Sequence, residues 1–161
     1  MFDALIEVAT AAKKLDENKI LQQVMSEPLV QAQILDLNKA QMYEKGVNAE
    51  GKSMGDYAPF TVEYKISVGQ RHDHITLKDT GKMYDSMRVK AQREETVITA
   101  NTVKERAGKT VYAGPGDKGI VISDLDEQYG PILGLTDESK EQILPEITER
   151  FLEKTRAALQ G

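Results

Sequence analysis

The glycines of this 161-residue chain fall almost entirely in its middle, and their placement constrains the fold more than any other feature. None of the twelve glycines precedes Gly46, and only the last residue is a glycine after Gly134. Because glycine disfavours the interior of a helix, two glycine-free ends favour terminal helices. The chain is therefore expected to place helices on both sides of a central region made of short elements and turns.

The apolar residues of the first end recur at the spacing of an amphipathic helix. The pattern includes Phe2, Leu5, Ile6, Ala9, Leu15, Ile20, Leu21, Val24, Val30, Ile34 and Leu37. Ser26-Glu27-Pro28 predicts a helix start, because a hydroxyl caps free N–H groups and proline suits the first turn. Gly46 predicts the end of that helix. A last helix is expected from Asp137, with Pro145 starting or kinking it.

The central region predicts short strands and short helices. Alternating or β-branched runs occupy residues 74–78, 87–91, 96–100, 110–113 and 119–123. The last two runs would be joined by a turn at residues 114–117, and short helices are expected over 61–68 and from Asp79 or Thr80 to Met87. The predicted fold class is α+β, with N-terminal helices, a small mainly antiparallel β-sheet and a C-terminal helix.

The length suits a single domain over residues 1–161. Within it we expect an N-terminal helical region (residues 1–46), a loop and β region (residues 47–136) and a C-terminal helix (residues 137–161). The chain has no cysteine and only two histidines, which disfavours a disulfide scaffold, a closed zinc site or a cysteine nucleophile. No cofactor or metal is expected. No apolar run approaches the ~20 residues of a membrane span, so we expect a protein without a membrane partner.

Residues Gly46 to Ser53 match the GxxxxGK[ST] phosphate loop. That loop needs a strand before it and a helix after it, so that backbone N–H groups converge on phosphates. Here a helical pattern precedes the loop, and Pro59 lies shortly after it. A helix stop followed by a turn is the preferred interpretation, and a nucleotide-binding enzyme remains a minor alternative.

Two shorter patterns also allow both a structural and a chemical interpretation. Asp79-Thr80-Gly81 resembles the aspartic-protease triplet, but Lys78 and Lys82 flank it and would lower the pKa of the carboxyl group. Helix capping is the preferred role. His72-Asp73-His74 offers too few ligands for a closed zinc site, so plain surface exposure is favoured.

The charge pattern disfavours tight binding to duplex DNA. The formal net charge is −5, whereas a DNA-binding protein usually presents a basic stripe. The densest basic stretch comprises Lys78, Lys82, Arg88, Lys90 and Arg93. Glu94 and Glu95 follow this stretch directly. The charge pattern is still compatible with a surface past which DNA slides without binding.

One stretch is distinctive as a whole. It runs through Gln41-Met-Tyr43, Gly51-Lys-Ser-Met-Gly-Asp-Tyr57-Ala-Pro-Phe-Thr61, Gly69-Gln70 and Ile75-Thr-Leu77-Lys-Asp79-Thr-Gly-Lys-Met-Tyr84-Asp-Ser-Met87. Tyr129-Gly130-Pro131 follows before the last helix. The stretch resembles the small neck, head–tail connector and tail-completion proteins of tailed bacteriophages, closest to those of gut Bacteroidales phages, including the crAss-like group. The resemblance covers about residues 38–160.

The resemblance implies a non-enzymatic structural protein of the virion. Copies would form a homo-oligomeric ring in the neck or tail region, beside portal or adaptor and tail proteins, after assembly in the cytoplasm of the bacterial host. DNA would pass nearby without specific binding. Aromatic side chains bury large rigid areas at interfaces, so the candidate subunit-interface residues are Tyr57, Phe60, Tyr64 and Tyr84. A soluble interaction module or regulator is the alternative function.

Overall fold

The computed structural model describes residues 2–100, 104–106, 109–111 and 122–160. These residues form seven helices and two antiparallel hairpins. The helices are α1 (Phe2–Lys13), α2 (Glu17–Met25), α3 (Pro28–Tyr43), α4 (Pro59–Ser67), α5 (Lys82–Ser86), α6 (Ile122–Tyr129) and α7 (Asp137–Gln160). The strands are β1 (Arg88–Ala91), β2 (Thr96–Thr99), β3 (Lys104–Arg106) and β4 (Lys109–Val111). The predicted α+β class, with helices at both ends, is confirmed.

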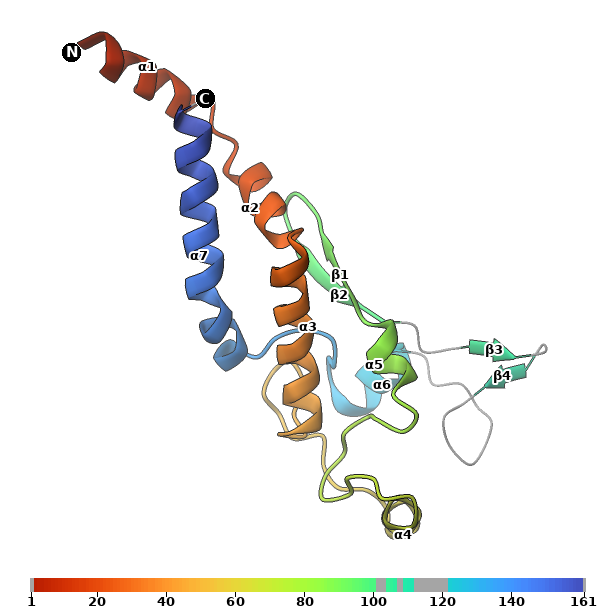
Figure 1. The fold of residues 1–161 in the computed structure, drawn as a ribbon. Coiled ribbons are helices and arrows are strands. Elements are labelled where there is room, and N and C mark those ends of the chain that lie inside the picture. Colours follow the sequence, from red (N-terminus) through yellow and green to blue (C-terminus); the bar gives the residue numbers. More distant parts are fainter. Residues whose placement is uncertain (1, 101–103, 107–108, 112–121, 161) are drawn as a thin grey trace.

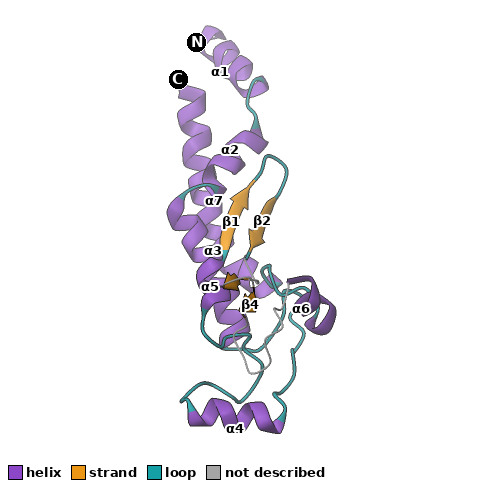
Figure 2. Cartoon of the chain, turned by 90° about the vertical axis from the view of Figure 1, so that its right-hand side faces the viewer, coloured by secondary structure: helices purple, strands orange, loops and turns teal. Residues whose placement is uncertain are grey.

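Three helices and one hairpin make the body of the molecule (Figure 1). Helix α7 packs along α2 and α3, and strand β1 packs against α2 and α3. In the hairpin, Arg88 lies opposite Thr99 and Ala91 lies opposite Thr96. Seen from the side, α1 lies at one end of this elongated body and α4 at the other (Figure 2).

Buried apolar side chains form two clusters in this body. The helical core consists of Val24, Val30, Ile34, Val89 and Ile143. The loop core consists of Met42, Met54, Ile75, Tyr84, Met87, Leu125 and Ile132. The first cluster joins the helices to the β1–β2 hairpin, and the second covers the end of α3 with segments from the middle of the chain.

The expected limits of α3 are close to those observed. Pro28 stands in its first turn, but Glu27 precedes it as the cap residue. Ser26 instead ends α2, where its hydroxyl donates to the carbonyl oxygen of Gln22. After α3 the chain turns at Gly46 with a φ of +63°, and a Cβ there would lie 2.5 Å from Cδ2 of His74. The stop therefore needs glycine both for its backbone angle and for space.

Two predicted strands are wrong. Residues 74–78 form an irregular segment, in which Leu77 has a φ of +54° and the backbone of Thr76 bonds to tyrosine hydroxyls. Side chains thus satisfy backbone groups that a strand would pair in a ladder. The predicted strand at residues 119–123 is wrong at Ile122 and Ser123, which begin α6, while residues 119–121 lie outside the described ranges. β4 pairs with β3.

The predicted hairpin at 87–91 and 96–100 and the helix at 61–68 are confirmed as β1–β2 and α4. Of the predicted run 110–113, residues 110–111 belong to β4 and the rest lies outside the described residues, as does the turn at 114–117. Pro145 does not start the last helix, because α7 begins at Asp137 and contains this proline.

Two side-chain amides of α3 hold the segment that leads into α7. Asn38 donates to the carbonyl oxygen of Ile132 at 3.1 Å and accepts from the N–H of Gly134 at 3.1 Å. Gln41 donates to the carbonyl oxygen of Gly134 at 2.6 Å and accepts from the N–H of Thr136 at 3.1 Å. Both side chains are buried, and each amide both donates to and accepts from the backbone of this segment. They thus supply the hydrogen bonds that a neighbouring strand would supply.

A third buried amide, that of Asn48, extends this set. Its Nδ2 donates to the carbonyl oxygen of Tyr129 at 2.8 Å, and its Oδ1 accepts from the N–H groups of Glu50 and Lys52 at 2.9 and 3.0 Å. We call Asn38, Gln41 and Asn48 the amide clamp. Through it, residues 129–136 are bound to α3 and to the turn that follows α3, without forming a strand.

Asn48→Ala should lower the free energy of unfolding by about 2 kcal/mol or more, because it leaves one carbonyl and two N–H groups without their partner. Urea unfolding followed by circular dichroism measures this loss. The matched control is Asn18→Ala, at an exposed position of α2, which should change stability by less than about 0.5 kcal/mol. Equal effects of the two substitutions would contradict a structural role of the clamp.

An ion cluster fastens α7 to the junction of α2 and α3. Glu27 accepts from Lys154 at 2.9 Å and from Arg150, which also bonds Glu146. Lys154 and then Arg150 hold the pKa of Glu27 below its ordinary value of 4.5 against the opposing effect of burial. The folded state therefore gains stability from ionised Glu27 at neutral pH.

This stabilisation should be complete above pH 4.5 and should be lost as the pH falls through the lower pKa of the folded state. Glu27→Gln removes the titrating group, so the variant should lose less stability than the wild type between neutral pH and about pH 3. Urea unfolding at a series of pH values tests this. The same pH dependence in both proteins would contradict the assignment.

Candidate interaction surface

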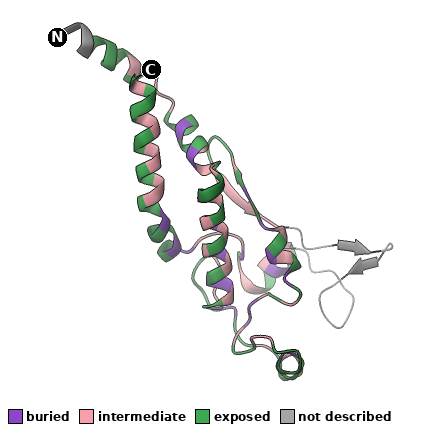
Figure 3. Cartoon of the chain, viewed as in Figure 1, coloured by how far each residue is buried: buried purple, intermediate pink, exposed green. Residues whose placement is uncertain are grey.

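Helix α4 stands apart from the body of the molecule (Figures 1 and 2). Large apolar side chains on and just after it face solvent, with Phe60 69% exposed. The exposed set consists of Phe60, Tyr64, Ile66 and Val68, which we call the α4 arm. Figure 3 shows the helix as largely exposed. An apolar surface of this kind on a projecting helix is typical of a contact with another protein.

A buried lysine helps to fix the arm to the rest of the chain. Lys65 points inward and is only 4% exposed. Its Nζ donates to Oε1 of Gln70 at 2.9 Å and to the carbonyl oxygen of Lys78 at 3.0 Å, and it lies 4.8 Å from the ring centre of Tyr57. Neutral oxygens and an aromatic face thus replace the water that this ammonium group loses.

Of the four predicted interface residues, Phe60 and Tyr64 lie in the α4 arm. Tyr57 is half-buried, and its hydroxyl bonds both the N–H and Oγ1 of Thr76, so it supports the chain's own loop. Ile66 and Val68, which the prediction missed, extend the exposed surface. The sequence could have identified both residues, because they are apolar and lie beside Phe60 and Tyr64 in one short helical segment.

Tyr84, the remaining residue predicted for a subunit interface, lies inside the chain's own fold. Its side chain is 6% exposed within the loop core, and its hydroxyl donates to the carbonyl oxygen of Thr76. Burial, followed by the nearby Tyr57 and Tyr43, raises the pKa of Tyr84 well above its ordinary value. Tyr84 therefore packs within its own chain, in one core with Ile75 and Met87.

The segment from Gly46 to Ser53 is not built as a phosphate loop. Val47 and Ser53 form an antiparallel bridge, and the N–H groups of Glu50 and Lys52 point to the buried Asn48 side chain. Lys52 pairs with Glu50 at 2.6 Å, and this bond raises the pKa of Lys52. The N–H groups that would bind phosphate are therefore occupied within the chain, as the helix-stop interpretation expects.

The two histidines serve local contacts. Nε2 of His74 lies 2.8 Å from the carbonyl oxygen of Tyr43, while Nδ1 of His72 lies 3.1 Å from that of Gln70. Asp73 between them bonds Arg71, which lowers the pKa of Asp73 to about 2. Among the residues that the structure describes, no group of three or more acidic, histidine or cysteine side chains could hold a metal ion.

The Asp79-Thr80-Gly81 triplet lies at the entry to α5. The carbonyl oxygen of Asp79 accepts from Gln70, and Gly81 precedes the helix with a φ of +80°. Thr80 accepts a long bond from the N–H of Lys82, at 3.4 Å. The predicted cap at Asp79 or Thr80 is therefore wrong, because Gly81 is the cap residue and no side chain caps the helix.

Comparison of the chain with family models, with curated proteins and with solved structures gives no match. Over the ranges of the chain that the structure describes, no helix combines the length and the apolar character needed to cross a membrane. The candidate site therefore stands on the geometry of the α4 arm and its lysine anchor.

Lys65→Met should release the α4 arm, because Gln70 and the carbonyl group of Lys78 lose their donor. We expect the amide protons of α4 to exchange about ten-fold faster or more, while the helical core keeps its protection. Hydrogen exchange read by mass spectrometry measures both regions. Lys82→Met, at an exposed position, is the control and should leave α4 unchanged. Unchanged exchange in Lys65→Met would contradict the anchoring role.

Proposed function

We propose that this chain is a non-enzymatic structural subunit of a tailed-bacteriophage virion, in the head–tail connector or tail-completion ring. The resemblance of residues 38–160 to neck and tail-completion proteins supports this class. The proposed partners are further copies of the chain, a portal or adaptor protein, and tail proteins. The proposed location is the neck or tail region of the particle, after assembly in the host cytoplasm.

The observation that carries the proposal is the α4 arm. Exposing Phe60 and Ile66 to water is unfavourable, at about 25 cal/mol for each Å² of apolar surface. The anchor at Lys65 keeps this apolar surface projecting from the body. A subunit that meets its neighbours through α4 would bury the arm only on assembly.

The charge of the chain fits a position beside DNA rather than a DNA-binding role. With a net charge of −5, the subunit would weakly repel the phosphate backbone as DNA passes. No substrate is assigned to the chain. The glycine loop that resembles a phosphate-binding motif uses its N–H groups within the fold, so it lends no support to the nucleotide-enzyme alternative.

Particle fractionation tests the proposal. The wild-type protein should be found in gradient-purified virions, whereas Phe60→Ser combined with Tyr64→Ser should reduce its incorporation about ten-fold or more, because the arm loses its apolar contacts. Quantitative mass spectrometry of the particles measures incorporation. Circular dichroism of both proteins verifies that the exposed substitutions leave the fold intact.

A matched control is Leu29→Ser, which removes another exposed apolar side chain, on α3 and far from the arm. It should be incorporated as the wild type is. Absence of the wild-type protein from purified particles, with the protein remaining in the lysate, would contradict the proposal and favour the alternative of a soluble interaction module or regulator.

A further inference from the structure

Helix α7 is apolar on two sides, and among the described residues its own chain covers one of them. Ile143, Ile147 and Phe151 pack into the helical core. On the other side, Leu144 is 58% exposed, and Leu152 is exposed as well. A helix with a second apolar face fits a contact beyond its own core.

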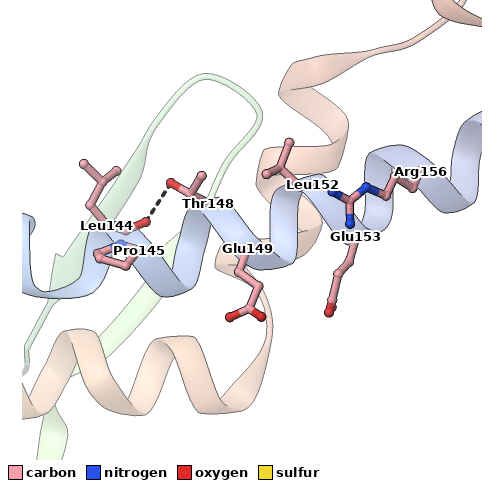
Figure 4. A pocket seen from close by; sticks show the side chains of 7 residues that line it. All are labelled: Leu144, Pro145, Thr148, Glu149, Leu152, Glu153 and Arg156. Atoms are coloured by element: carbon pink, nitrogen blue, oxygen red, sulfur yellow. Dashed lines mark hydrogen bonds between the residues drawn. The ribbon is translucent and has the colours of Figure 1, made fainter.

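This second face is a shallow groove along the helix. It is lined by Leu144, Pro145, Thr148, Glu149, Leu152, Glu153 and Arg156. Figure 4 shows these side chains in two rows, with Leu144, Thr148 and Leu152 on one side and Pro145, Glu149 and Glu153 on the other. Such rows of residues four apart form the ridges between which another helix packs.

Helix α1 is only partly covered within its own chain. It contacts α7 near the C-terminal end of that helix, and none of the side chains described from Ile6 to Lys13 is buried (Figures 1 and 3). An isolated helix of this length is marginal in water. Ala11 and Leu15 are half-buried, whereas Ile6, Ala9 and Lys13 share an exposed stripe at helical spacing.

The two surfaces match in charge and in length. Glu149 and Glu153 in the groove form no ion pair within the described residues, and the same is true of Lys13 and Lys14 at the end of α1. With a rise of about 1.5 Å per residue, α1 and the groove from Leu144 to Arg156 are each about 18 Å long.

We propose that α1 of one copy docks in the α7 groove of a second copy, with Ile6 and Ala9 against the leucine row and Lys13 and Lys14 beside Glu149 and Glu153. The contact joins two different surfaces of the same chain, so repeating it generates either a closed ring or a filament. It rests on the proposed function, since it adds a second pair of surfaces, besides the α4 arm, by which ring subunits would meet.

Sedimentation velocity of the purified full-length protein over a concentration series tests the docking. The wild type should self-associate. Both E149K/E153K and K13E/K14E should weaken association roughly ten-fold or more, because like charges then face each other. The quadruple variant restores opposite charges in exchanged positions and should regain association. E94K/E95K, at the exposed turn of the β1–β2 hairpin, changes the net charge by the same amount as E149K/E153K and should associate as the wild type does.

A wild type that stays monomeric at every concentration would overturn the docking. Normal association of both E149K/E153K and K13E/K14E would overturn it too. So would a quadruple variant that does not regain association. Weakening by E149K/E153K alone would also overturn it, because α1 would then not be the occupant. If the docking test fails, incorporation of the protein into particles through α4 is still expected. If the protein associates as predicted but is absent from virions, the result counts against the proposed function and not against the docking.

Discussion

The fold depends on side-chain amides that replace a missing β-ladder. Asn38, Gln41 and Asn48 bond the backbone between Tyr129 and Thr136, which has no strand partner of its own. Because α7 starts directly after this segment, the amide clamp sets the point from which the long helix runs back along α2 and α3. The ion cluster around Glu27 then holds the same helix farther along its length. Apolar packing supplies the driving force, and these polar contacts select one arrangement.

The body so formed carries two surfaces that it leaves uncovered. At one end the α4 arm presents aromatic and aliphatic side chains, and along one flank α7 presents a groove. The two differ in how they are held. The arm is held by the buried ammonium group of Lys65, whereas the groove belongs to a helix that is fixed by both the clamp and the ion cluster. Surfaces held in such different ways suit different steps of an assembly: the groove can be present beforehand, and the arm can adjust on contact.

Elements with strong local signals could be predicted from the sequence. Pro28 and Gly46 delimit α3 through their backbone preferences, and the β-branched run near Val97 marks the second strand of the hairpin. The alternation of Ile75 and Leu77 was misleading, since hydroxyl groups from Tyr57 and Tyr84 satisfy that backbone instead. Phe60 and Tyr64 could be chosen as surface aromatics, but no local pattern separates them from the buried Tyr84.

The amide clamp was missed because single amides in a helix usually face solvent. A signal was nevertheless present: Asn38 continues the stripe of Val30 and Ile34 at a spacing of four, so it had to face the core. One further property follows from the layout in Figure 1, where both termini lie at the end of the body opposite α4. A protein domain fused after Gln160 would therefore lie at the end of the molecule far from the α4 arm. Two copies of the chain could also be joined by a linker that need not span the length of the molecule.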